Sequence, residues 1–327
     1  MASFDTAGIS GQPERMVDIS TGPADSLRQR GGRIPGSAGQ PAWSLTRFDP
    51  PPIPVLIAAP HGGRTYPADL AGRMRHAAAA SLRLEDRFTD LLAEAVARET
   101  GATLLVAHAP RAMIDLNRSP EDMDWEMVAG GAPDGSGSLA AGRRARSGLG
   151  LVPRRLPGMG ELWSRLMTRE DLEARIAHVH RSYHAALAAQ LEALRDRWGA
   201  ALLLDLHSMP PLGPKTGRDA APDFVIGDRF GAACDSALAA VAFDHFAASR
   251  RPAAHNRPYA GGYVLDRHAA PARALHAMQV EVCRTAYLDS HMQDPGPGMV
   301  AVVEVLAGLV RRLAGELAAG ARAQAAE

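Results

Sequence analysis

Residues 202–210 have the sequence LLLDLHSMP, in which an apolar run leads directly into His207 and a turn. A short apolar run that is bounded by turn residues is typical of a buried β-strand. In open α/β folds, the groups at the carboxyl ends of strands face the ligand crevice. The stretch therefore predicts a strand that presents a histidine to a functional site.

The same pattern occurs a second time at residues 55–63, which have the sequence VLIAAPHGG. Here a short apolar run ends in His61, and the two following glycines allow the backbone to bend tightly. Either histidine alone is also compatible with an ordinary polar residue at the end of a strand. Two histidines at two strand ends favour a pair of metal ligands.

Composition and charge exclude several classes of protein. The chain has 327 residues, and its 36 basic and 36 acidic residues cancel, so no basic surface indicates a nucleic acid or a membrane as partner. No apolar run approaches the roughly 20 residues that span a bilayer, and the N-terminus lacks the apolar core of a signal peptide. Cys234 and Cys283 are far apart, which argues against a disulfide framework or a thiolate zinc site. We expect a cytoplasmic protein that is a monomer or a small homo-oligomer.

The chain is predicted to form one α/β domain over residues 50–327. Residues 1–49 are rich in Gly, Pro, Ser, Asp and Arg without a sustained period, which predicts a tail or a loosely packed arm. From about residue 119 to residue 160 the periodicity is lost again. We expect a loop insertion there, which forms a lid or is locally disordered.

Strand and helix patterns alternate through the rest of the chain. Further apolar runs that predict strands lie at 103–107, 112–116, 224–226 and 277–283. Helical periodicity is found at 84–92, 169–198 and 298–320. This alternation predicts a three-layer α/β/α sandwich with a mostly parallel mixed sheet.

The clearest predicted helix, at residues 169–198, carries His180 and His184 one turn apart. This spacing can hold zinc, but no glutamate follows the first histidine as in the H-E-x-x-H motif. We interpret both histidines as the polar flank of a helix whose apolar stripe packs in the core.

A metal held by two histidines usually needs a third protein ligand, often a carboxylate. Asp86 is the candidate, and Glu85 and Asp90 compete with it for the same role. Acidic residues are also common at the start of a helix because they interact favourably with the helix dipole. The sequence therefore leaves the third ligand among these three carboxylates.

Glu281 lies within an apolar strand pattern, between Val280 and Val282. A carboxylate that is buried in such a strand must be paired, bound to a metal or catalytic. The alternative is a strand face that turns toward solvent.

Two segments offer groups that bind an anionic ligand. Arg111, Asn117 and Arg118 form the first, because a guanidinium binds a carboxylate through two parallel hydrogen bonds and a neighbouring amide can fix a carbonyl. Asn256 and Arg257 begin the second, whose Gly-Gly turn allows the backbone to approach a ligand closely. An ordinary turn is the alternative for this second segment.

Taken together and in this order, these motifs resemble the N-formylglutamate amidohydrolase family. The resemblance implies a phosphorylase/hydrolase-like α/β/α fold with one zinc ion per chain. It also implies hydrolysis of N-formyl-L-glutamate to formate and L-glutamate, the last step of one route of histidine degradation. The matching stretches are 60–63, 86–90, 111–118, 183–184, 204–210, 227–229, 256–263 and 279–281.

The resemblance also implies roles for individual residues. His61 and His207 match zinc ligands, Glu281 matches the general base, and Asn117 with Arg118 matches the site for a substrate carboxylate. More distant carboxypeptidase relatives carry two ligands as H-x-x-E, whereas Arg64 stands in place of that glutamate here. We therefore place the third zinc ligand at Asp86.

Three other functions are compatible with parts of the sequence. A serine hydrolase could pair Ser208 with a histidine, although no G-x-S-x-G motif is present. A metal-free binder of acidic amino-acid derivatives would keep the arginines and would not need Glu281. A metallohydrolase could also act on another N-acyl amino acid or a small peptide.

Overall fold

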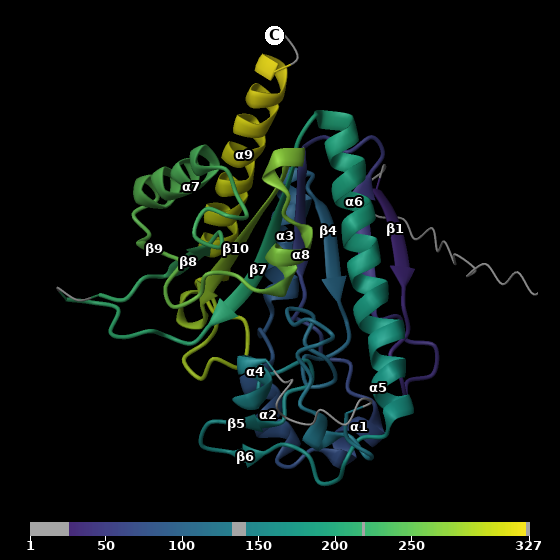
Figure 1. The fold of residues 1–327 in the computed structure, drawn as a ribbon. Coiled ribbons are helices and arrows are strands. Elements are labelled where there is room, and N and C mark those ends of the chain that lie inside the picture. Colours follow the sequence, from purple (N-terminus) through teal and green to yellow (C-terminus); the bar gives the residue numbers. More distant parts are fainter. Residues whose placement is uncertain (1–25, 133–141, 218–219, 325–327) are drawn as a thin grey trace, which may run out of the picture.

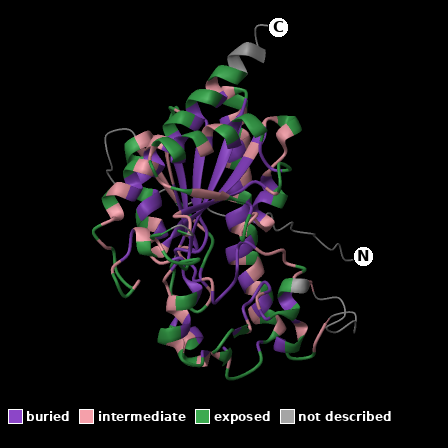
Figure 2. Ribbon diagram, turned by 90° about the vertical axis from the view of Figure 1, so that its left-hand side faces the viewer, coloured by how far each residue is buried: buried purple, intermediate pink, exposed green. Residues whose placement is uncertain are grey.

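The fold is built on one mixed sheet, seen in a computed structural model that describes residues 26–132, 142–217 and 220–324 (Figure 1). The strand order is β1-β2-β4-β3-β7-β10-β8-β9, and the four central strands β4, β3, β7 and β10 run parallel. The strands are β1 (Ser26–Gly31), β2 (Trp43–Phe48), β3 (Val55–Ala59), β4 (Thr103–Ala107), β7 (Ala201–Met209), β8 (Phe224–Gly227), β9 (Ala253–His255) and β10 (Leu275–Cys283). The central strands consist largely of buried apolar residues, as a parallel sheet covered on both faces requires (Figure 2).

Helices cover both faces of the sheet. Helices α3, α7 and α9 pack over one face, and α6 and α8 pack over the other. The longer helices are α3 (Thr89–Thr100), α6 (Ser182–Trp198), α7 (Ser236–Ala248) and α9 (Met299–Gln324); the shorter ones are α1 (Ala68–Arg73), α2 (Ala77–Leu84), α4 (Arg143–Arg146), α5 (Arg169–Arg175) and α8 (Tyr263–His268). The predicted three-layer α/β/α sandwich is confirmed. None of the helices in the described part of the chain has the length and apolarity to cross a membrane.

The predicted arm at residues 1–49 is wrong for residues 26–48. Strands β1 and β2 form an antiparallel pair there, and β2 joins them to β4. Trp43 and Leu45 of β2 are buried, whereas β1 is a polar edge strand. Because these two short strands lack the apolar run of the central strands, the sequence pattern did not predict them. Residues 1–25 lie outside the described part of the chain.

Two other predicted elements differ from the structure. Residues 112–116 form turns rather than a strand, although Met113 and Ile114 are buried as the apolar pattern indicated. The helical pattern at 84–92 is divided, because α2 ends at Leu84 and α3 begins at Thr89. Phe88 adopts a left-handed conformation with φ of 57° and separates the two helices. The turn between them carries Asp86.

The insertion at 119–160 packs against the body of the protein where it is described. It contributes buried apolar side chains to the core on the α6 face, and it contains α4 and part of the hairpin of β5 (Arg155–Leu156) and β6 (Gly160–Glu161). Residues 133–141 of the insertion lie outside the described residues. A role of this segment as a lid stays a prediction.

The predicted helix at 169–198 contains one π turn. Residues Ile176–Arg181 form this turn between α5 and α6, and the chain continues without interruption on both sides. Turns of this kind occur mostly as single insertions within α-helices, frequently at functional sites. Here it carries His180, and His184 follows in the first turn of α6.

Candidate active site

The pairing of β7 with β10 places four polar side chains on one face of the sheet. Asp205 lies opposite Gln279, and His207 lies opposite Glu281. Because residues two apart in a strand point to the same side, all four share the face that α6 covers. They lie near the carboxyl ends of the strands, which point toward α2 and α4 in Figure 1. All four side chains are buried.

The end of β3 brings a second histidine to the same place. His61 begins the turn after β3, and Gly63 passes so close to Ala109 that an added Cβ would lie 2.2 Å from its carbonyl oxygen. The His61 carbonyl accepts a hydrogen bond of 3.0 Å from the Asp86 backbone N–H. The turn between α2 and α3 is thereby attached to the end of β3, which positions Asp86.

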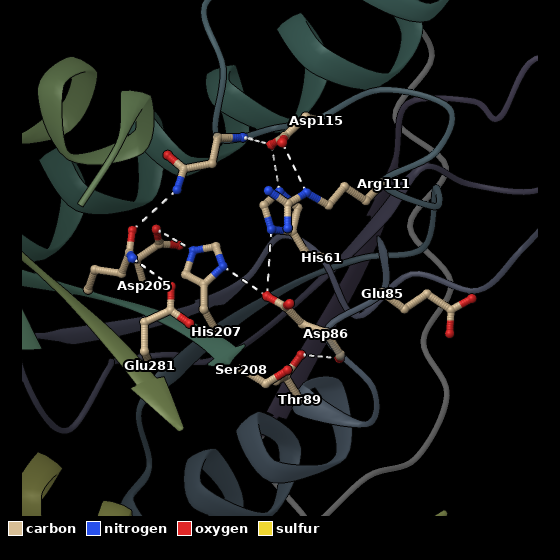
Figure 3. A network of polar contacts seen from close by, with 12 residues as sticks. His61, Glu85, Asp86, Thr89, Arg111, Asp115, Asp205, His207, Ser208 and Glu281 are labelled. Atoms are coloured by element: carbon tan, nitrogen blue, oxygen red, sulfur yellow. Dashed lines mark hydrogen bonds and ion pairs between the residues drawn. The ribbon is translucent and has the colours of Figure 1, made fainter. Parts of the chain in front are cut away.

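His61, Asp86 and His207 converge as a buried cluster whose candidate ligand atoms all lie within 4.8 Å of one another. The Oδ2 atom of Asp86 is 2.9 Å from Nδ1 of His207 and 3.6 Å from Nδ1 of His61. Figure 3 shows the two imidazole rings on either side of this carboxylate. The three residues that the sequence nominated as metal ligands are thus brought together, and their role as ligands remains a prediction.

A carboxylate holds the outer nitrogen of each imidazole. Nε2 of His61 is 2.8 Å from Asp115 Oδ1, and Nε2 of His207 is 2.9 Å from Asp205 Oδ2. With Nε2–H donating outward, each Nδ1 directs its lone pair toward the centre of the cluster. Nδ1 of His61 is buried and has no hydrogen-bond partner among the described residues. Metal-binding histidines are typically held in this way, so these donors fit a metal ion.

The electrostatics of the cluster also favour a cation. Burial alone would raise the pKa of Asp86, but the neighbouring imidazoles of His207 and His61 hold that pKa well below its usual range. Burial would lower the pKa of His207, but the carboxylates of Asp205 and Asp86 raise it well above its ordinary value. The cluster therefore attracts positive charge, either as a proton on His207 or as a metal ion in its place.

Glu281 lies beside the cluster and has a different environment. Burial raises the pKa of Glu281 to about 7, although His207 opposes this shift. The Nε2 group of Gln279 donates a hydrogen bond of 2.9 Å to Glu281 Oε1, and the Asn117 amide donates to Gln279 in turn. A carboxyl group with a pKa near neutrality can both accept and return a proton.

These residues line one cavity of about 240 Å³. Two acidic residues, Asp86 and Glu281, and five arginines line this cavity. Backbone and side chains of the segment from Pro258 to Gly262 close another side. The arginines that line the cavity are Arg83, Arg111, Arg118, Arg144 and Arg284.

The first predicted anion-binding segment lines this cavity. Arg111 donates from Nε to Asp115 Oδ2 at 2.9 Å, and Arg118 donates to the carbonyls of Leu149 and Asn117. Two terminal nitrogens of Arg111 and one of Arg118 have no hydrogen bond within the described protein. The Asn117 side chain is instead engaged on both sides, since it also accepts from the backbone N–H of Val264. Asn117 therefore positions Gln279 rather than offering a free amide.

The second predicted segment lines the cavity, but not through the predicted residues Asn256 and Arg257. Asn256 is buried and bonds to Asp228 through both parts of its amide. Arg257 is exposed and does not line the cavity. The prediction that these two side chains bind substrate is therefore corrected, because the chain turns at this point and presents Tyr259 and the Gly261-Gly262 backbone instead.

The two other candidates for the third ligand, Glu85 and Asp90, are each paired with an arginine. Glu85 lies 2.8 Å from Arg87, and Asp90 makes two hydrogen bonds with Arg64, of 2.8 and 2.7 Å. Arg64 thus pairs with a carboxylate of the adjacent helix. Among the three neighbouring carboxylates, only Asp86 belongs to the cluster with His61 and His207.

Ser208 does not form a nucleophile–histidine pair in the described structure. It follows His207 in β7, and adjacent strand residues point to opposite faces. Its hydroxyl accepts a hydrogen bond of 3.1 Å from Arg284 Nε. The geometry gives no support to a serine hydrolase.

His180 and His184 form hydrogen bonds with the backbone of a segment that contributes to the site. Their Nε2 groups donate to the carbonyls of Arg118 and Leu116, at 2.9 and 3.0 Å. Burial lowers the pKa of both side chains, and that of His184 falls well below its ordinary value. These neutral histidines hold the segment that contains Asn117, and they are buried rather than on the polar flank that the helical pattern predicted.

Together these features define a class of protein, an α/β enzyme with a candidate metal centre beside a protonatable glutamate. The model of the family described as N-formylglutamate amidohydrolase matches residues 53–288. The chain belongs to this family. It is a hydrolase that acts on an amide bond.

Characterised relatives agree with this assignment. The chain is 32% identical over 275 residues to the N-formylglutamate deformylase of Pseudomonas aeruginosa, covering 83% of this chain and 94% of that protein. It is 30% identical over 264 residues to the deformylase of Pseudomonas putida, covering 72% and 82%. The crystal structure of N-formylglutamate amidohydrolase from Ralstonia eutropha JMP134 has a TM-score of 0.75 and 31% identity, covering 85% of this chain and 99% of that chain.

Proposed function

We propose that this protein is a zinc-dependent N-formylglutamate deformylase, which hydrolyses N-formyl-L-glutamate to formate and L-glutamate. The observation that carries the proposal is the arrangement of His61 and His207. Each ring is anchored at Nε2 by a carboxylate, and each directs Nδ1 toward Asp86. The proposed substrate is the one named for the relatives in the two Pseudomonas species, N-formylglutamate.

His61, Asp86 and His207 would hold one metal ion and leave a fourth position for water or substrate. Two imidazoles and a carboxylate suit zinc, although other transition metals accept the same donors. When bound, zinc supplies a Lewis acid that makes water easier to deprotonate and polarises the substrate carbonyl.

The side chains of this protein then account for the proton transfers. Glu281 accepts a proton from the attacking water as the new C–O bond forms at the formyl carbon. It returns that proton to the amine nitrogen as the C–N bond breaks, so atoms and charge balance. The free terminal nitrogens of Arg111 can stabilise the negative charge that develops on the carbonyl oxygen. Arg118 is assigned to the carboxylate next to the amide.

We place the reaction in the cytoplasm and in histidine degradation. Cys234 and Cys283 are free and buried, which agrees with a reducing compartment. The protein is proposed to act as a monomer or a small homo-oligomer on a small acidic substrate.

The direct test is a hydrolysis screen with zinc-loaded protein. N-formyl, N-acetyl and N-succinyl derivatives of acidic and neutral amino acids are compared by release of acid and amine. N-formyl-L-glutamate should have the highest kcat/KM, and a chelator should abolish its turnover. Faster cleavage of another acyl group would replace the proposed substrate, and activity after complete removal of the metal would overturn the metal-dependent mechanism.

Activity should fall as the pH is lowered through the range in which Glu281 becomes protonated. The base must be ionised to accept a proton, and burial raises the pKa of Glu281 to about 7. A bound cation favours the carboxylate and shifts this pKa downward. The logarithm of kcat/KM should therefore decline with unit slope below this shifted pKa, at a pH lower than about 7, with zinc content measured at each pH. A flat acid limb at constant zinc content would contradict the role of Glu281.

Asp205→Asn should weaken zinc binding by about tenfold to a hundredfold, since it removes the carboxylate that anchors His207 Nε2. Zinc affinity is measured by competition with a chromogenic chelator. Asp228→Asn is the matched control, because Asp228 lies 2.9 Å from His255 Nε2 but outside the cluster. Equal zinc affinity of the parent and the Asp205 variant would show that this contact does not support the metal site.

A further inference from the structure

Two arginines at the cavity have roles that the mechanism leaves open. Arg83 lies at the end of α2 and Arg144 lies in α4, within the insertion at 119–160, and both line the cavity that contains the cluster. Figure 1 shows both helices at the end of the sheet where the parallel strands finish. Both side chains are exposed. Within the described residues, neither guanidinium has a hydrogen-bond or ion-pair partner.

The other arginines of the cavity are committed to the protein. Arg284 donates from all three nitrogens, to the Ser208 hydroxyl and to the carbonyls of Leu82 and Glu85. Arg111 and Arg118 each use part of their guanidinium to hold neighbouring groups. The cavity therefore has an inner set of arginines that the protein holds at least in part, and an outer pair whose donors have no partner among the described residues.

The charge of the cavity calls for an anionic ligand. Its five arginines outnumber the two carboxylates that line it, and a metal ion would add further positive charge. Cations that share a small cleft raise the local concentration of an anion and repel one another until it binds. A volume of about 240 Å³ matches a ligand of the size of an amino-acid derivative.

The position of the outer pair distinguishes between the two carboxylates of such a ligand. The amide to be cleaved must reach the buried cluster, and the carboxylate beside it then lies near the inner arginines. A carboxylate at the end of the amino-acid side chain extends away from the amide toward the exposed rim. Arg83 and Arg144 are the cavity arginines at that rim with free donors.

We propose that Arg83 and Arg144 bind the side-chain carboxylate of the substrate and make the enzyme selective for N-formyl derivatives of acidic amino acids. This inference rests on the proposed function and deepens it. It also gives the insertion at 119–160 a purpose, because α4 supplies one half of the anion site. The alternative is that Arg83 and Arg144 are solvated surface residues, which would have no effect on the choice of substrate.

Selectivity between two substrates of equal shape tests the assignment. Zinc-loaded full-length protein is assayed with N-formyl-L-glutamate and with N-formyl-L-glutamine, whose side chain ends in a neutral amide. The double variant Arg83→Gln/Arg144→Gln should lose about tenfold to a hundredfold in kcat/KM for the glutamate substrate, mainly through KM. The loss for the glutamine substrate should be several-fold smaller. Equal losses on both substrates, or no loss on either, would overturn the proposal.

A control removes one arginine charge elsewhere. Arg312 is an exposed arginine of α9 that does not line the cavity. Arg312→Gln should leave the ratio of the two kcat/KM values unchanged, and thermal unfolding verifies that all variants fold. If Arg312→Gln alters the ratio as much as the double variant does, the effect is one of general charge and the assignment fails.

A binding measurement separates this inference from the deformylase function. Glutarate carries two carboxylates and butyrate carries one, and calorimetry with zinc-loaded protein compares their affinities. Glutarate should bind more tightly to the parent, and the double variant should lose that advantage. If this result is obtained without deformylase activity, the proposed reaction fails and the anion site stands. If deformylation occurs without preference for glutamate over glutamine, the reaction stands and the anion site is refuted.

Discussion

Glu281→Gln should lower kcat by about a hundredfold to ten-thousandfold while the protein keeps its fold and its zinc. Glutamine has nearly the same shape and can still contact Gln279, but it cannot accept the proton of the attacking water. General acid–base catalysis typically contributes a factor of this size. Because binding of the substrate does not depend on proton transfer, KM should change much less than kcat. Steady-state kinetics and metal analysis of the same preparation measure both quantities.

The control for this variant is Glu94→Gln in α3. Burial also raises the pKa of Glu94, but this residue does not line the cavity. Its replacement should leave kcat and zinc content unchanged. If the Glu281 variant loses zinc together with activity, Glu281 is a metal ligand rather than the base. A kcat within a few-fold of the parent at full zinc content would exclude both roles.

His61→Ala and His207→Ala should each lose zinc and activity together. Removing one imidazole leaves two protein ligands, which hold a metal ion only weakly. A ligand that binds only the folded protein raises its stability, so zinc should raise the unfolding temperature of the parent. In either variant this increase should disappear. Metal content, formate release and thermal unfolding with and without zinc measure the three effects.

His245→Ala controls for the loss of a buried histidine. His245 lies in α7, and its Nε2 group donates to the Val305 carbonyl, away from the cluster. This variant should be less stable than the parent but should still bind one zinc ion and respond to it on heating. If His61→Ala or His207→Ala retains stoichiometric zinc and near-normal turnover, that histidine has only a structural role.

The histidine positions could be predicted because each lies at or just after the end of a strand that the fold buries completely. Every residue of β3 and β7 is buried, and apart from Asp205 the run that leads to each histidine is apolar. A polar residue that ends such a run must face a functional space or be paired. The same reasoning identified Glu281 and could have identified Asp205, since a residue two positions before His207 shares its face of β7.

The remaining parts of the site depend on contacts between distant segments. Asp115 lies in a turn, and nothing local in the sequence shows that this turn meets the imidazole of His61. The choice of Asp86 over Glu85 and Asp90 depends on the break between α2 and α3, which an apolar pattern spanning both helices concealed. Arg83 could not be connected with Arg144, because only the packing of the insertion brings their two helices to one cavity.

The π turn at Ile176–Arg181 adds one residue to the helix that contains it. Such a turn holds one residue more than the α-helical turn it replaces, so deletion of one residue would restore a regular α-helix. The two sides would keep nearly their present orientation, because both kinds of turn complete one revolution of the helix. Leu172 and Tyr183 would stay buried, whereas the widened turn that carries His180 would be lost, and with it the hydrogen bond to the Arg118 carbonyl. In evolutionary terms, relatives that have one residue fewer in this stretch should keep the helix and its buried side chains but lack this contact.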